Sequence, residues 1–337
     1  MSLASGKISI AVDAMGGDYA PDEVIAGSIA ALKEQDIEIV LVGQPEVLRE
    51  KLAEYDITGL PLRCVDASEC IKEGEPPATV LRQKRDASIL VATKLAKTGQ
   101  VDAVVSAGPT GAVVAASLMV LGIVEGVERP VFGGSPIGLT EKSILLDCGG
   151  NIDCKPEHLL NFALVGSVYV RKLMGVENPT IALLSVGSEE GKGNELVKES
   201  YHMFQESGMN FIGNVEGNDI VTGKANVIVC DGFIGNVLLK FCEGFGYSLN
   251  RWLRSRLDGK MADSDRDEIC DELHTITNAA DIIGGVPLLG INGNVVVMHG
   301  RSRAPHFIGA LSCAGDMVRS GFVESLNSEL LQTRRQQ

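Results

Sequence analysis

A glycine pair flanked by two carboxylates stands directly after the first apolar run of the chain. The run covers residues 8–12, and Asp13, Gly16, Gly17 and Asp18 follow it. Glycine adopts positive φ, and its lack of a side chain lets backbone N–H groups approach a ligand closely. Open α/β folds bind ligands at such turns between a strand and a helix. The segment is therefore either a ligand-binding turn or only a tight connection, since glycine pairs are common turn formers.

Five more apolar runs end in glycine and polar residues. The segments that follow them are residues 107–111, 147–151, 186–194, 231–236 and 299–302. In a parallel sheet the carboxyl ends of the strands lie along one edge, where ligand-binding crevices form. We therefore expect all six glycine turns to converge on one cleft.

Two residues in these turns could bind an anion. Lys192 stands between Gly191 and Gly193 where a helix should begin, and a lysine with backbone N–H groups at a helix start binds phosphate. A solvent-exposed lysine is the alternative. Asn236 also lies near a predicted helix start, where its amide either donates to an oxyanion or caps the helix.

The common catalytic signatures are absent from the sequence. It has no Gly-x-Ser-x-Gly elbow, no Walker lysine loop and no His-Glu-x-x-His helix. The histidines show no metal-ligand spacing, and among them only His299 falls at the predicted edge, with a capping or core role as open as a catalytic one. A site rich in groups that bind anions and poor in nucleophilic side chains suits a reaction in which a substrate is the nucleophile. Inorganic phosphate is already an oxyanion at neutral pH. An acyl thioester is a suitable electrophile because its thiolate leaves readily, since the pKa of a thiol is about 8.5.

Apolar strands alternate with amphipathic helices along the chain, which predicts a mostly parallel sheet covered on both faces. The predicted strands are residues 8–12, 38–42, 62–65, 103–106, 143–146, 180–185, 227–230 and 295–298. The predicted helices are residues 22–33, 46–54, 81–97, 112–122, 157–173, 195–206 and 233–257. The polar segment 258–272 predicts a solvated helical hairpin or excursion.

Composition narrows the class of protein. The 337 residues suffice for two domains or for one large α/β domain with a subdomain. A net charge of −14 argues against nucleic-acid binding, which needs a basic footprint. The eight cysteines show no two-residue spacing and no secretory signal precedes them, so we expect free thiols in the cytoplasm. The uncharged stretch 103–124 is interrupted by Gly108-Pro109-Thr110-Gly111, which favours a buried strand and helix over a membrane span.

Motifs in order from about residue 8 to about residue 310 resemble the phosphate acyltransferase family (PlsX). They are Asp13-Ala-Met-Gly-Gly-Asp18 with Pro21, Glu128-Arg129-Pro130, Leu146-Asp147 with Gly149 and Asn151-Ile-Asp153, Asn178-Pro179 followed by Ala182-Leu183-Leu184, Gly187 with Glu189-Glu190 and Lys192-Gly193, Thr222-Gly223-Lys224, Val229-Cys-Asp-Gly-Phe233 with Gly235-Asn236-Val237 and Leu239-Lys240, Leu288-Leu289-Gly290, and His299-Gly300. The resemblance implies transfer of a fatty acyl group from acyl-acyl carrier protein to inorganic phosphate. The acyl phosphate would serve glycerophospholipid synthesis and pass to a membrane glycerol-3-phosphate acyltransferase.

The same resemblance implies the architecture and partners. We expect a homodimer without metal or bound cofactor, in the cytoplasm or peripherally at the membrane. The fold would be a three-layer α/β/α fold like those of phosphotransacetylases and isocitrate/isopropylmalate dehydrogenases. One acyltransferase domain would span residues 7–330, with a helical excursion at 251–280 and flexible termini at 1–6 and 331–337.

Carried over position by position, the resemblance implies a set of site residues. The expected catalytic residues are Lys192, Asn236, Asp231 and His299. The expected substrate-binding residues are Asp13, Gly16, Gly17, Asp18, Gly108, Thr110, Gly111, Asn151 and Gly193.

Four departures from the family pattern stand out. Pro109 replaces a usual Asn, Gly150 replaces a usual Ala, and Arg301 and Arg303 stand where small polar residues or Ala are common. The fourth is a cationic segment in place of a strongly apolar helical tip. Its three arginines, Arg251, Arg254 and Arg256, could steer an acidic carrier protein to this acidic chain.

Two alternatives to the main function stay open. One is a phosphotransacetylase-like enzyme that uses acyl-coenzyme A. The other is a catalytically silent paralogue that binds acyl chains or a partner acyltransferase, which the proline at position 109 would favour because it removes a side-chain amide and a backbone N–H.

Overall fold

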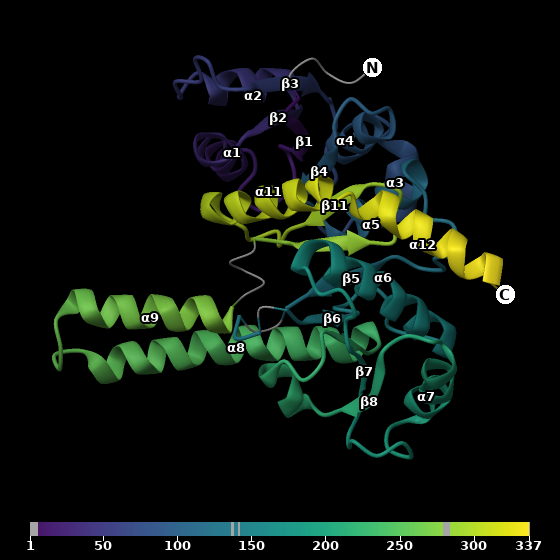
Figure 1. Cartoon of the computed structure of the whole chain (residues 1–337). Coiled ribbons are helices and arrows are strands. Elements are labelled where there is room, and N and C mark those ends of the chain that lie inside the picture. The colour runs from purple at the N-terminus through teal and green to yellow at the C-terminus, as the bar shows by residue number, and fades with distance from the viewer. Residues whose placement is uncertain (1–5, 136–137, 141, 279–283, 337) are drawn as a thin grey trace. The chain divides into compact units, whose positions relative to one another are not determined.

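The computed structural model describes residues 6–135, 138–140, 142–278 and 284–336. Its contacts divide the chain into two compact units, one formed by residues 1–130 and 283–337 and the other by residues 131–282 (Figure 1). We call them unit 1 and unit 2. The prediction of a single domain over 7–330 stays a prediction. Of the expected flexible termini, residues 1–5 and 337 lie outside the described residues, whereas residues 331–336 continue a helix.

Unit 1 is built on a largely parallel sheet. Its strands are β1 (Ile8–Asp13), β2 (Ile37–Gly43), β3 (Leu62–Asp66), β4 (Ala103–Ser106), β10 (Val286–Leu289) and β11 (Asn294–Val297). They pair in the order β3-β2-β1-β4-β11-β10, and all pairs are parallel except the antiparallel pair of β10 with β11. The central strands β1, β2 and β4 are apolar and buried, as expected for strands covered on both faces.

Helices cover this sheet. They are α1 (Asp22–Glu34), α2 (Pro45–Leu52), α3 (Pro77–Gln83), α4 (Ser88–Lys97), α5 (Thr110–Val120), α11 (Ala304–Arg319) and α12 (Phe322–Gln336). Helix α1 packs against α11, and α4 packs against α5. The crossover α4 connects β3 with β4 and contacts β1, β2 and β4, which places the loop after β4 beside the loop after β1.

Unit 2 repeats the arrangement on a smaller scale. Its strands are β5 (Val131–Gly134), β6 (Ile144–Leu146), β7 (Ile181–Leu184), β8 (Phe211–Val215) and β9 (Val227–Val229). They pair in the order β5-β6-β9-β7-β8, with β5 antiparallel and the rest parallel. Its helices are α6 (Pro156–Met174), α7 (Glu195–Glu206), the 3₁₀ helix η1 (Gly217–Thr222), α8 (Gly232–Leu257) and α9 (Asp263–Thr277).

The eight strands predicted from the sequence are present within one or two residues of their expected bounds. The prediction of one helix over residues 81–97 is wrong, because α3 ends at Gln83 and α4 begins at Ser88. The intervening Asp86 accepts hydrogen bonds from the backbone N–H and the hydroxyl of Ser68, both at 2.7 Å. A bridge between Glu69 and Ala87 adds to this pairing. These contacts fix a turn at Arg85 and Asp86 that separates the two helices.

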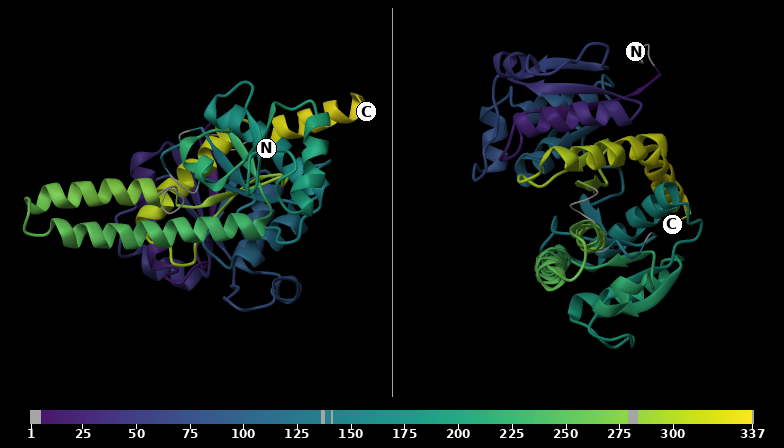
Figure 2. Two further views of the ribbon diagram at one scale, coloured as in Figure 1. Left: turned by 90° about the horizontal axis from the view of Figure 1, so that it is seen from below. Right: turned by 90° about the vertical axis from the view of Figure 1, so that its left-hand side faces the viewer.

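The long helix α8 pairs with α9 in an antiparallel helical hairpin (Figures 1 and 2). We call the C-terminal half of α8, together with α9, the α8–α9 hairpin. This hairpin covers the polar segment for which the sequence predicts a solvated hairpin, although residues 279–280 of the expected excursion lie outside the described residues. In the described part of the chain, no helix is both long and apolar enough to cross a membrane.

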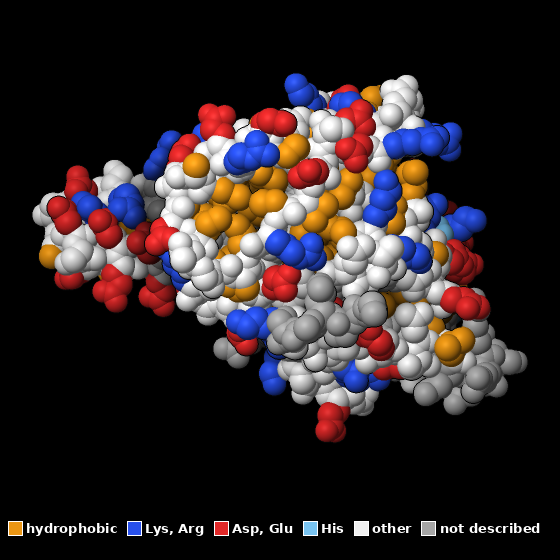
Figure 3. Space-filling view, turned by 90° about the horizontal axis from the view of Figure 1, so that it is seen from above, with side chains coloured by type: hydrophobic (Ala, Val, Ile, Leu, Met, Phe, Trp, Pro, Cys, Tyr) orange, Lys and Arg blue, Asp and Glu red, His pale blue; other side chains and the backbone are white. Residues whose placement is uncertain are grey.

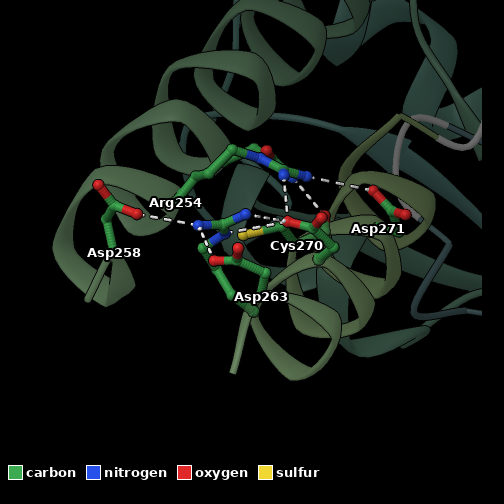
Figure 4. A network of polar contacts seen from close by, with 8 residues as sticks. Arg254, Asp258, Asp263, Cys270 and Asp271 are labelled. Carbon is green, nitrogen blue, oxygen red and sulfur yellow. Dashed lines mark hydrogen bonds and ion pairs between the residues drawn. The ribbon is translucent and has the colours of Figure 1, made fainter. Parts of the chain in front are cut away.

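Ion pairs join the two helices of the hairpin (Figure 4). Arg254 of α8 forms ion pairs with Asp267 and Asp271 of α9. Arg266 of α9 contacts Asp258 at 2.9 Å and Asp263 at 2.8 Å. Carboxylates are interspersed with the Lys and Arg side chains over this hairpin (Figure 3). Arg254 and Arg266 are thus engaged with carboxylates of the hairpin.

Candidate active site

In unit 1 the loops after β1 and β4 are joined through a buried carboxylate. Asp13 accepts a hydrogen bond from the hydroxyl of Ser106 at 2.8 Å, and that hydroxyl accepts one from the N–H of Gly108 at 3.0 Å. Burial raises the pKa of Asp13, and its hydrogen bonds to Ser88, Ser106 and the N–H of Met15 oppose the rise. A side chain at residue 16 would place its Cβ 2.7 Å from the Gly108 nitrogen, so only glycine fits there.

The loop after β11 joins the same group. The N–H of Asp18 donates to the carbonyl of Gly300 at 2.7 Å. Gly17 has a φ of +112°, a conformation that favours glycine. His299 precedes Gly300 and is half-buried. Three of the six glycine turns therefore meet within unit 1.

Pro109 fits its position at the start of α5. It is the residue that caps α5, and its carbonyl accepts hydrogen bonds from the N–H groups of Ala112 and Val113. Thr110 and Gly111 form the first turn of the helix and are exposed. A proline at a helix start removes no hydrogen bond of the helix, because the first N–H groups have no partner within it. The substitution therefore leaves the loop and the helix intact.

In unit 2 a second buried carboxylate organises the loop after β6. Asp147 accepts hydrogen bonds from the N–H groups of Gly150 at 3.0 Å and Asn151 at 2.6 Å, and from the side-chain amide of Asn151 at 2.8 Å. It also accepts one from the N–H of Phe132 at 3.2 Å. Burial raises the pKa of Asp147, and these hydrogen bonds oppose the rise. These bonds hold the loop after β6 against the C-terminal end of that strand.

The loop after β9 packs onto this loop. The N–H of Gly232 donates to the carbonyl of Asn151 at 2.7 Å. An ideal Cβ at Gly149 would lie 3.3 Å from the side-chain oxygen of Asn236, so the two loops are in close contact. Asp231 caps α8 by accepting a hydrogen bond from the N–H of Ile234 at 2.9 Å. Asn236, one turn into the helix, is exposed.

The loop after β7 carries the predicted cation. Lys192 is exposed, and its Cγ would lie 2.9 Å from a Cβ at Gly187, so the stem of the lysine lies across the loop. Gly193 has a φ of +111° and leads into Asn194. Asn194 caps α7 by accepting a hydrogen bond from the N–H of Val197 at 3.0 Å.

A cavity of about 260 Å³ lies between the loops after β7 and β9. Gly193 and Asn194 line it from one loop and Cys230 and Asp231 from the other. Most of the remaining wall is aliphatic. Desolvation raises the pKa of the Cys230 thiol well above its ordinary value, so this group stays protonated and neutral at physiological pH. The three remaining glycine turns therefore lie together in unit 2, two of them around one cavity.

The structure thus groups the predicted site residues by unit. Unit 1 brings together Asp13, Gly16, Gly17, Asp18, Gly108, Thr110, Gly111 and His299, and unit 2 brings together Asn151, Lys192, Gly193, Asp231 and Asn236. The convergence of all six turns on one cleft stays a prediction. Arg251, Arg254 and Arg256 lie toward the far end of α8, away from the loop at its N-terminus.

Sequence reasoning missed Asp147 and Ser106 as site residues. Both follow the pattern of a strand-terminal polar residue directly before a glycine turn. What distinguishes them is burial, since Asp147 and Ser106 have no exposed surface. That property belongs to the folded chain and not to the local sequence.

A sequence model of the family described as "Fatty acid synthesis protein" matches residues 8–325. The chain belongs to this family. A protein named phosphate acyltransferase from Desulfitobacterium hafniense (strain DSM 10664 / DCB-2) is 43% identical over 331 residues, which cover 95% of this chain and 97% of that protein. The resemblance to the phosphate acyltransferase family is therefore confirmed.

Solved structures share the fold of this family member. A phosphotransacetylase from Streptococcus pyogenes matches with a TM-score of 0.65 and 17% identity, covering 94% of this chain and 95% of that one. A 4-hydroxythreonine-4-phosphate dehydrogenase from Klebsiella pneumoniae matches with a TM-score of 0.56 and 14% identity, covering 93% and 98%. These likenesses concern the fold alone, and they confirm the expected three-layer α/β/α class with phosphotransacetylase-like and dehydrogenase-like neighbours.

Proposed function

We propose that this protein transfers a fatty acyl group from acyl-acyl carrier protein to inorganic phosphate. The observation that carries the proposal is the grouping within unit 2, where the loops bearing Lys192, Asp231 and Asn236 enclose an apolar cavity and contact the loop of Asn151. This places a cation and polar groups beside a space suited to hydrocarbon. The relative named phosphate acyltransferase supports the same reaction.

The chemistry needs positioning more than a protein nucleophile. A phosphate oxygen attacks the thioester carbonyl carbon, the carbonyl oxygen becomes an oxyanion, and the carbon–sulfur bond breaks as the carrier thiolate leaves. The products are an acyl phosphate and the free carrier thiol. In this proposal Lys192 holds phosphate, and Asn236 donates to the oxyanion. Asp231 positions the loop by capping α8, as its hydrogen bond to Ile234 indicates. His299, in the loop after β11 of unit 1, is a further candidate for a catalytic residue.

Trapping of the product with hydroxylamine tests the proposed reaction. The protein is incubated with phosphate and either acylated carrier protein or acyl-coenzyme A, and the acyl hydroxamate is measured. We expect phosphate-dependent product with the carrier donor at a higher kcat/KM than with the coenzyme donor. A higher value with acyl-coenzyme A would assign the phosphotransacetylase-like function instead. No product from either donor would leave the silent, ligand-binding protein as the better reading.

The ion pairs of the hairpin reduce the set of arginines, Arg251, Arg254 and Arg256, that could contact the carrier protein. Arg254 is engaged with Asp267 and Asp271, so we retain the exposed Arg251 and Arg256 as the proposed contacts. Charge reversal of both should raise the KM for acylated carrier protein and leave kcat unchanged. Lys260→Glu on the same hairpin is the matched control. An unchanged KM in the double variant would remove this surface from the proposal.

A homodimer is proposed from the resemblance and from one exposed stripe of α8. Phe233, Val237, Phe241 and Phe245 recur at four-residue spacing, and each is more than half exposed. The rings of Phe241 and Phe245 stack at 5.8 Å. A contiguous apolar stripe of this kind favours an interface. Sedimentation of Phe241→Glu should show a monomer where the unmodified protein sediments as a dimer, and an unchanged dimer would place the interface elsewhere.

The wider setting of the reaction is also a proposal. We place it in the cytoplasm, where the acyl phosphate passes to a membrane glycerol-3-phosphate acyltransferase.

A further inference from the structure

The cavity of unit 2 has a hydrocarbon wall. Its aliphatic lining comes from α6, β7, α7 and α8, through Leu159, Leu184, Leu196, Ile234 and Leu238. Leu159 and Leu184 are buried. Val186, which also lines the cavity, is 82% exposed and marks its open side. The space is therefore a largely apolar pocket that opens to solvent.

Two polar side chains at its rim, Asn194 and Asp231, cap helices. The side-chain oxygen of Asn194 accepts a hydrogen bond from the N–H of Val197, and that of Asp231 accepts one from the N–H of Ile234. The hydroxyl of Ser185, which also lines the pocket, is buried and has no hydrogen-bond partner among the described residues. The thiol of Cys230 is protonated at physiological pH because burial raises its pKa. The pocket therefore offers an occupant apolar contact below a polar rim.

We propose that this pocket binds the hydrocarbon chain of the acyl donor, with the thioester at the rim formed by Gly193 and Asp231. The inference rests on the proposed acyl transfer and identifies the part of unit 2 that would bind the hydrocarbon chain of the donor. Lys192 directly precedes Gly193, so the predicted cation is adjacent in the chain to one side of the rim. A polar headgroup or a nucleotide does not match the wall, because none of the described residues that line it is a Lys or an Arg.

The volume of the pocket sets how much of the chain it holds. A protein cavity of about 150 Å³ lined by aliphatic and aromatic side chains accommodates benzene, with six carbons. By the same proportion, about 260 Å³ accommodates on the order of ten carbons. Each buried methylene contributes about fourfold in apparent affinity. The kcat/KM should therefore rise with chain length by up to about fourfold per methylene and level off near ten carbons.

A chain-length series with pocket-filling variants tests the assignment. Acylated carrier proteins with chains of four to sixteen carbons are the donors, and hydroxamate formation is the readout. Leu238→Trp should lower kcat/KM for chains of ten carbons or more by at least tenfold and change the four-carbon value by less than twofold. Leu196→Phe, a milder change on a different helix, should show the same trend at smaller size. Ile212→Trp is the control, because Ile212 is exposed on β8 and does not line the pocket.

The outcomes separate the pocket from the proposed reaction. Absence of product from every donor with the unmodified protein would refute the reaction. Normal turnover with a flat chain-length profile, or with long-chain activity untouched in both pocket variants, would refute the pocket while the reaction stands. Should Leu238→Trp fail to fold, as judged by its thermal transition, Leu196→Phe alone decides. Loss of long-chain activity in the Ile212 control as well would also count against the pocket.

Discussion

Asp147 and Asn151 are joined twice, since the carboxylate of Asp147 accepts the backbone N–H of Asn151 at 2.6 Å and its side-chain amide at 2.8 Å. Both bonds end on the same oxygen of a side chain with no exposed surface. The carbonyl of Asn151 in turn accepts the N–H of Gly232. One buried carboxylate therefore sets the loop after β6 and, through Asn151, the start of α8.

Replacing this carboxylate by an amide should damage both stability and turnover. In Asp147→Asn the new NH₂ group faces N–H donors, so buried groups lose their acceptor. We expect a loss of about 1–3 kcal/mol in the free energy of unfolding, measured in urea, since removal of the buried charge offsets part of the lost hydrogen bonding. Asp153→Asn, an exposed position in the same loop, should stay within about 0.5 kcal/mol. Equal stability of both variants would contradict the assigned role of Asp147.

Two glycines of α8 should respond oppositely to the same substitution. A Cβ at Gly235 would lie 1.8 Å from the carbonyl oxygen of Asp147, so Gly235→Ala should destabilise unit 2 by about 3 kcal/mol or more. Gly244, on the same helix, has nothing within 4 Å of its ideal Cβ. Gly244→Ala should stabilise by about 0.5–1 kcal/mol because alanine favours the helix. Thermal unfolding of the pair checks both signs, and a stable Gly235→Ala protein would contradict the close approach.

Lys192→Ala should lose most activity while the fold survives, because Lys192 is exposed. We expect kcat/KM to fall by about 10²–10³-fold. Lys192→Arg, which keeps the charge, should retain more activity than the alanine variant. Millimolar phosphate should raise the melting temperature of the unmodified protein and not that of Lys192→Ala. Turnover of the alanine variant at the normal rate would move the phosphate site elsewhere.

Glu23 should make the stability of unit 1 depend on acid pH. Its carboxylate accepts the N–H of Ala304 at 2.7 Å, and this bond, with Arg303, lowers the pKa of Glu23 below 4.5. A lowered folded-state pKa gives stability that is present above the unfolded-state value and is lost as the pH falls through the folded-state value. Glu23→Gln should therefore cost roughly 0.5–1 kcal/mol at pH 7 and progressively less toward pH 3.

The measurement is thermal unfolding across that pH range. Glu34→Gln, at the exposed end of the same helix, is the control and should stay close to the unmodified protein. A difference between Glu23→Gln and the unmodified protein that stays constant with pH would contradict the assigned bond.

The alternation of strands and helices was predictable because buried parallel strands leave short apolar runs. The strands that were missed lack this signal. Val131–Gly134 ends in two glycines, and Val286–Leu289 contains a proline. Phe211–Val215 is interrupted by Gly213, at which its register with β7 shifts. Each is defined by pairing with a distant strand, which a local pattern does not contain.

For the site, the glycine turns were visible in the sequence and the groups that fix them were not. Lys192 and Asn236 could be named because their glycine context is local. The acceptor role of Asp147 and the hydroxyl relay of Ser106 depend on burial under other elements. The pocket is a product of tertiary packing, since its wall comes from five segments between Leu159 and Leu238.

Helix α8 runs unbroken for 26 residues, which corresponds to about 39 Å. Ile234 and Leu238 line the pocket at one end, and Arg254 meets α9 at the other. A protein bound at the distal end of α8 therefore contacts residues that do not line the pocket. Substitutions at the distal end can consequently change the binding of a partner protein without altering the residues that line the pocket. The distal end is therefore a suitable place to engineer new binding partners.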